Sequence, residues 1–168
     1  MRTLGIMGPL DDPDYVAGSK AQDEDDFEKA RRHFERASDR GNFFALGELC
    51  IVCDRLGDLD ATRRHTAKLE ALALMSAEAS YVAAKSLESC FNTFAFDECK
   101  TKHNRYLLNA ADIGNPMAQL EVASNLSLGA NGFEKSRVDA QRWVRRAADQ
   151  LGNDGLPDWA REMLTSDA

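Results

Sequence analysis

The stretch Ala110-Ala111-Asp112-Ile113-Gly114-Asn115-Pro116-Met117-Ala118 has the composition of a corner between two helices. Gly114 favours the left-handed backbone that ends a helix, and Asn115 is a good N-cap for the helix that follows. The pattern Ala-x-Asp-x-Gly-Asn-x-x-Ala also occurs 73 residues earlier, at Ala37, and in a looser copy 37 residues later, at Ala147. A unit of about 37 residues with one degenerate copy predicts a helical repeat array. The predicted fold class is therefore all-α, a short α/α solenoid of stacked helix hairpins.

Small and apolar residues on both sides of this corner recur every three or four positions, as in amphipathic helices. They predict helices over residues 27–40, 43–56, 59–74, 77–90 and 98–111, and two more around residues 118–126 and 139–148. Pro157 can open a short C-terminal helix that caps the stack. The loop after residue 90 carries three phenylalanines, which we expect to pack inward.

Acidic residues crowd residues 1–25 and few bases accompany them. This composition predicts an irregular acidic segment, which is either a solvated tail or an arm that docks on a basic partner. The repeat domain then spans residues 26–164, and residues 165–168 form a tail.

Composition and charge exclude several classes of protein. No run of about eighteen apolar residues occurs in the sequence, so we expect no membrane span. The net charge of −7 and the pI near 5.0 argue against nucleic acid as a partner and leave open a basic protein. The amino terminus makes a poor secretory signal, which predicts a cytoplasmic protein. Four cysteines in that compartment are expected to be reduced, although a bridge between Cys90 and Cys99 stays open.

The repeat resembles the Sel1-like repeats, which are relatives of the tetratricopeptide repeats. The second half of their unit is matched three times in phase, by Asp139, Ala140, Trp143, Ala147, Ala148 and Gly152, by Tyr106, Ala110, Ala111 and Gly114, and by Asp26, Lys29, Ala30, Phe34, Ala37 and Gly41. Tyr15 and Gly18 resemble the remnant of a leading unit that lacks its first helix. The resemblance implies a right-handed stack of helix pairs that binds proteins and catalyses no reaction. Members serve as adaptors, and some bacterial ones as immunity or regulatory proteins.

The sequence contains few residues in patterns that carry chemistry. Cys50 and Cys53 have Cys-x-x-Cys spacing, but no second ligand pair accompanies them and both occupy core positions of the repeat. His33, His65 and His103 lie on three different predicted helices, none with a ligand at metal spacing. We therefore predict no catalytic residue, no metal and no cofactor. The alternative is a metal- or thiol-dependent protein that uses the two cysteines and the histidines.

The predicted binding surface follows from the repeat geometry. In stacked hairpins the first helices line the concave side, where partners bind. Positions around the equivalent residues Ala45, Ala79 and Ala118 then define a partner-binding strip of apolar residues with a polar rim: Phe44, Ile51, Tyr81, Met117 and Leu120, with Asp54, Glu78, Lys85, Glu88 and Ser124. Either a protein partner binds this strip, or neighbouring repeats and the N-terminal segment cover it. We predict a protein–protein interaction module, and one specific form of that prediction is an immunity or inhibitor protein against a toxic effector.

Overall fold

The computed structural model describes residues 11–90 and 92–165, and this part of the chain contains helices and turns but no strands. Its nine α-helices are α1 (Pro13–Asp23), α2 (Phe27–Asp39), α3 (Phe43–Arg55), α4 (Leu59–Ala73), α5 (Ala77–Leu87), α6 (Phe96–Ile113), α7 (Pro116–Leu128), α8 (Arg137–Leu151) and α9 (Asp158–Thr165). A short 3₁₀ helix, η2 (Asn153–Gly155), connects α8 to α9. The all-α prediction is confirmed.

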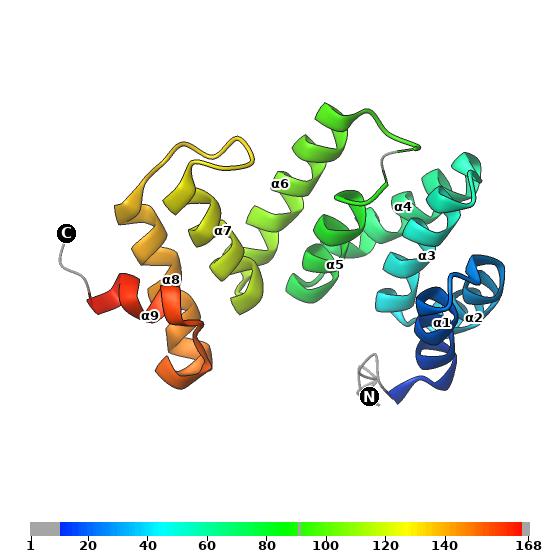
Figure 1. The fold of residues 1–168 in the computed structure, drawn as a ribbon, viewed down its shortest axis with the longest axis horizontal. Coiled ribbons are helices and arrows are strands. Elements are labelled where there is room, and N and C mark those ends of the chain that lie inside the picture. The colour runs from blue at the N-terminus through cyan, green and yellow to red at the C-terminus, as the bar shows by residue number, and fades with distance from the viewer. Residues whose placement is uncertain (1–10, 91, 166–168) are drawn as a thin grey trace.

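The helices follow one another along an arched array, with α1 and α2 at one end and α9 at the other (Figure 1). Each helix packs on its neighbours in sequence, and α3 also packs directly on α5. Four hairpins result: α1–α2, α3–α4, α5–α6 and α7–α8. Three core clusters of buried apolar residues run along the array, as in a helical repeat protein in which each unit buries its apolar face against the next.

The corner between α6 and α7 is built as its sequence predicts. Gly114 adopts φ 115°, and the amides of Gly114 and Asn115 donate to the Ala110 carbonyl at 3.1 and 2.8 Å. The Asn115 side chain accepts from the Ala118 amide at 2.9 Å. Ala111 and Ala118 are 0% exposed, so their small side chains let α6 and α7 approach closely.

The degenerate corner between α4 and α5 keeps the cap but not the glycine. Ser76 accepts from the Ala79 amide at 3.0 Å, in the place where Asn42 caps α3 by accepting from Ala45 at 3.1 Å. The side-chain cap is therefore common to these corners, because each new first helix has amides that need an acceptor.

The prediction of an irregular segment over residues 1–25 is wrong where the structure describes it. Asp12 caps α1 by accepting from the amides of Asp14 and Tyr15, and Pro13 takes the first helical position, where its missing amide costs nothing. Residues 1–10 lie outside the described residues. Thr165, assigned to the tail, is the last residue of α9, and residues 166–168 also lie outside the described part.

Helix α1 is the first helix of the leading hairpin, so the expectation that this unit lacks its first helix is wrong. Its Gly18 lies against Phe34 of α2, where an added Cβ would lie 2.6 Å from the Phe34 ring. The Tyr15 ring packs on the same phenylalanine, with 5.8 Å between centroids. Gly18 is thus required for the close approach of the two helices.

Asp12 and Asp14, at the start of α1, are paired with bases in α2 and at its C-cap, so these two aspartates do not belong to a solvated tail. Asp14 accepts from Arg36 and from Arg40, both at 2.8 Å, and lies 2.9 Å from His33 Nδ1. Asp12 is 1% exposed and accepts from Arg40 at 2.6 Å. The hydrogen bonds from Arg36 and His33 hold the pKa of Asp14 well below its usual range.

The loop before α6 differs in part from its prediction. Phe94 packs against the central core cluster and lies under the Lys102 ammonium, 4.8 Å from the ring centroid. Phe96, however, begins α6 and is 66% exposed. Phe91 lies outside the described residues.

We predict that Ala118→Leu destabilises the protein by roughly 1–3 kcal/mol, because the α6–α7 crossing has no room for the added carbons. Urea unfolding followed by circular dichroism measures the change. Met117→Leu, at the exposed neighbouring position, serves as the control and should change stability little. Equal stability of Ala118→Leu and wild type would contradict the packing of this crossing.

We predict that Asp14→Asn lowers stability near pH 7 by about 1 kcal/mol, the upper range for a partly exposed ion pair. Because the folded-state pKa of Asp14 is lowered, its contribution is fully present above the unfolded pKa of about 3.9. That contribution is lost as the pH falls towards the folded-state value. The stability difference should therefore shrink below about pH 4 in unfolding curves measured from pH 3 to 8. Asp23→Asn, at the exposed end of the same helix, is the control, and a difference independent of pH would contradict the assignment.

Candidate functional site

The ten residues predicted to bind a partner differ in solvent exposure: some are buried, some half-buried and some exposed. Asp54 and Leu120 are buried, so the prediction is wrong for these two. The others remain accessible and form what we call the first-helix face: Glu78, Glu88 and Met117 are exposed, and Phe44, Ile51, Tyr81, Lys85 and Ser124 are half-buried.

Leu120 is buried because its position in the repeat faces the next element of the array. It lies two residues after Ala118, as Gly47 lies two after Ala45. An added Cβ on Gly47 would lie 2.5 Å from Val82 of α5, so this position touches the following first helix. At the end of the array α9 takes that place, and Leu120 packs in a cluster with Ala160 of α9.

Asp54 is buried because it joins two hairpins. Its carboxylate accepts from the Asn92 amide at 3.1 Å, and its carbonyl accepts from the Asn92 side chain at 3.0 Å. Asp54 therefore fastens the end of α3 to the loop between α5 and α6.

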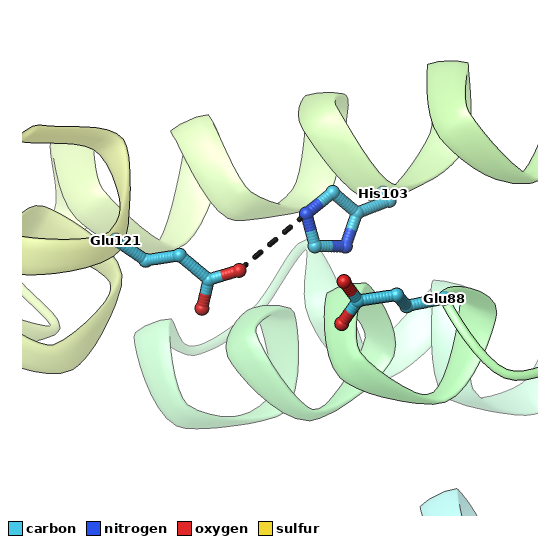
Figure 2. A group of neighbouring side chains, drawn as sticks. All are labelled: Glu88, His103 and Glu121. Carbon is cyan, nitrogen blue, oxygen red and sulfur yellow. Dashed lines mark ion pairs between the residues drawn. The ribbon is translucent and has the colours of Figure 1, made fainter. Parts of the chain in front are cut away.

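Five polar side chains meet where α5, α6 and α7 come together, and we call them the three-helix polar cluster: Tyr81, Lys85, Glu88, His103 and Glu121. Tyr81 and Lys85 lie on α5, Glu88 is the C-cap residue of α5, His103 lies on α6 and Glu121 on α7. In Figure 2 the carboxylates of Glu88 and Glu121 both lie below the imidazole of His103. The cluster contains three residues of the predicted strip and adds His103 and Glu121, which the strip did not contain.

Glu121 is the centre of the hydrogen bonding in this cluster. It accepts from the Tyr81 hydroxyl at 3.3 Å and from the Lys85 ammonium at 3.3 Å. The same ammonium donates to Glu88 at 2.5 Å. Burial alone would lower the pKa of Lys85, but the carboxylates of Glu88 and Glu121 outweigh it and raise the pKa. Burial, with the charge of Glu121, raises the pKa of Tyr81.

His103 is held by its backbone partner in a single tautomer. Its Nδ1 lies 3.0 Å from the Ala84 carbonyl oxygen, and because a carbonyl only accepts, Nδ1 carries the proton. The other nitrogen, Nε2, lies 3.6 Å from a carboxylate oxygen of Glu121, the pair joined by the dashed line in Figure 2. This atom is buried and makes no hydrogen bond within the described part of the chain.

A small pocket adjoins the cluster. Its volume is about 180 Å³, and it is lined by Glu88, His103, Phe96, Cys99, Lys100 and Asn131. The pocket is smaller than a typical drug-sized ligand site of about 300–1,000 Å³, so it suits a water molecule, an ion or one side chain.

The residues that could hold a metal ion differ from those that the sequence offered. The ligand atoms of Glu88, His103 and Glu121 lie within 4.8 Å of one another, and they are the sole group of three His, Cys, Asp or Glu ligands in the residues that the structure describes. Cys50 and Cys53 do not belong to it.

The four cysteines are unbridged and buried. Burial raises the pKa of Cys50 to about 12 and that of Cys53 to about 11, so little thiolate is present at neutral pH. Cys90 and Cys99 form no bridge: the Cys99 thiol contacts the Cys90 carbonyl oxygen at 3.7 Å. Since the thiolate is the nucleophile and the ligand, this arrangement disfavours a thiol-dependent function.

The sequence did not reveal this cluster, because its members are distant in the chain. Glu88, His103 and Glu121 are separated by 15 and 18 residues and lie at the C-cap of α5, on α6 and on α7, so no spacing within one helix relates them. One feature of the sequence pointed to Glu121. When the repeats are aligned on Ala79 and Ala118, Glu121 of α7 stands where α5 has Val82. A carboxylate also stands at this register position on α3, as Glu48, so the position is polar in two of the three first helices.

Comparison with protein-family models and with curated proteins finds no match to this chain. None of the described helices combines the length and apolar character needed to cross a bilayer.

We predict that the native protein reacts slowly with a thiol reagent such as dithionitrobenzoate, because all four thiols are buried and their pKa values are raised. In denaturant four thiols should react at once. Fewer than four would reveal a disulfide, and rapid reaction of the native protein would contradict the burial of these side chains.

Proposed function

We propose that this protein is a non-enzymatic protein-binding module, a short Sel1-like solenoid whose partner docks on the first-helix face. The observation that carries the proposal is the exposure of apolar and aromatic side chains on successive first helices. Phe44 and Ile51 of α3, Tyr81 of α5 and Met117 of α7 all lie outside the fully buried core. Apolar anchors within a polar rim are typical of protein interfaces.

The aromatic part of this face is concentrated at the start of α3. The rings of Phe43 and Phe44 are stacked with 4.4 Å between centroids, and both are half-buried. Aromatic side chains supply large contact area at low cost in conformational entropy, which favours this point as an anchor for a partner.

Charge favours a basic partner. Glu78 and Glu88 are exposed beside the apolar residues, and the whole chain carries a net charge of −7. The one lysine of the face, Lys85, is paired with Glu88 and Glu121. A basic surface would therefore be attracted during encounter, an effect that salt weakens.

The proposal includes a cytoplasmic location and, as a specific form, an immunity or inhibitor role against a toxic effector. Reduced, buried thiols are compatible with a reducing compartment. The identity of the captured partner distinguishes an inhibitor from an adaptor.

We predict that Met117→Asp reduces capture of the partner at least about fivefold, because loss of an apolar anchor contact costs more than about 1 kcal/mol. Tagged wild type and variant are used to capture proteins from a lysate of the native cell, and bound proteins are quantified by mass spectrometry. Met117 is 53% exposed, so the variant should fold normally. Phe44→Asp should have the same effect.

Val138→Asp is the matched control, since Val138 is 55% exposed and lies on α8, a second helix. It should capture the partner as wild type does. Identical capture by wild type, Met117→Asp and Phe44→Asp would contradict the proposal.

A further inference from the structure

The Nε2 atom of His103 is buried and has no hydrogen-bond partner in the described part of the chain. His103 is 4% exposed. Buried polar atoms nearly always have a partner, because a lost interaction with water is costly. With Nδ1 protonated towards Ala84, the neutral ring presents a lone pair at Nε2, and it faces the Glu121 carboxylate, which also only accepts. A cation between them satisfies both atoms.

The spacing of these atoms fits a metal ion. Bonds of about 2.0–2.2 Å to a tetrahedral Zn²⁺ place two ligand atoms roughly 3.4 Å apart. The distance from His103 Nε2 to the Glu121 oxygen is 3.6 Å. The Glu88 carboxylate completes a group within 4.8 Å, and as an exposed side chain it can move closer.

The hydrogen bond on the far side of the ring is the one a metal-binding histidine needs. Histidine ligands generally donate their second ring N–H to a carboxylate or a backbone carbonyl, which fixes the tautomer and the direction of the free nitrogen. Here the Ala84 carbonyl accepts from Nδ1 at 3.0 Å. We propose that His103, Glu88 and Glu121 form a binding site for a divalent transition metal such as Zn²⁺, a role distinct from the docking of a protein on the first-helix face.

Lys85 supplies the positive charge of this site when no metal is bound. Its ammonium donates to Glu88 at 2.5 Å and to Glu121 at 3.3 Å, between the two carboxylates that would bind the ion. The Lys85 side chain is 43% exposed, so it can withdraw into solvent. A divalent ion then replaces one positive charge by two, and the lysine lowers the affinity by competing with it.

Metal binding would join two repeats. Glu88 and His103 belong to the α5–α6 hairpin and Glu121 belongs to α7, so the ion would bridge the junction at the Gly114 corner. Three protein ligands leave a fourth position, for which the adjoining pocket has room.

The test is a calorimetric titration of the purified full chain with Zn²⁺ near neutral pH, in the presence of a phosphine reductant. We expect one equivalent to bind wild type and raise the melting temperature. His103→Gln and Glu121→Gln should each weaken binding at least about tenfold, since each removes a ligand or its charge. Lys85→Met should strengthen binding, because it removes the competing ammonium. His65→Gln, on α4 and outside the group, is the control and should bind as wild type does.

Circular dichroism is used to check that each variant is folded. If His103→Gln does not fold, Glu121→Gln still tests the site. Absence of Zn²⁺ binding to wild type up to about 1 mM would overturn the proposal. Binding by Lys85→Met alone would not rescue it, because Lys85 would then prevent metal binding in the native protein. Binding that survives both ligand substitutions would also overturn it. So would a thiolate charge-transfer band with Co²⁺, since it would assign the metal to cysteine.

Discussion

The close approach of helices at small residues is the constraint on which the rest of this structure depends. Helix α6 can lie against α7 because Ala110, Ala111 and Ala118 at their crossing are 0% exposed and carry only a methyl group. The same principle places α1 on α2 through Gly18 and α3 on α5 through Gly47. Backbones held this close fix the rotation of each helix, and the rotation decides which side chains face a neighbour and which face solvent.

Polar side chains fasten the hairpins in two places, and the contrast between them is informative. At the N-terminal hairpin, Asp12 and Asp14 accept from the bases of α2, with Arg40 bonded to both. In the three-helix polar cluster, Glu121 also accepts from two donors, but the neighbouring His103 nitrogen does not find one. No side chain of the first network has a buried polar atom without a partner, whereas the second network retains one at His103 Nε2.

The proposed binding face and the proposed metal site adjoin, because Glu88 belongs to both. The face extends along α3, α5 and α7, whereas the metal ligands lie at the junction of α5, α6 and α7. An ion at that junction would hold the α7 part of the face, with Met117, in a fixed position relative to Tyr81. The angle between adjacent repeats sets the shape of such a surface, so the two proposals are physically compatible yet tested separately.

The sequence by itself determined the helices, their corners and the alanine positions, because hydrophobic period, caps and left-handed glycines are local properties of the chain. It identified Ala45, Ala79 and Ala118 as equivalent positions of the repeat, and all three are buried. Only the tertiary structure decided that Leu120 turns to the C-terminal cap and that Glu88, His103 and Glu121 meet. These depend on how each helix rotates against the next hairpin, and contacts between residues far apart in the chain set that rotation.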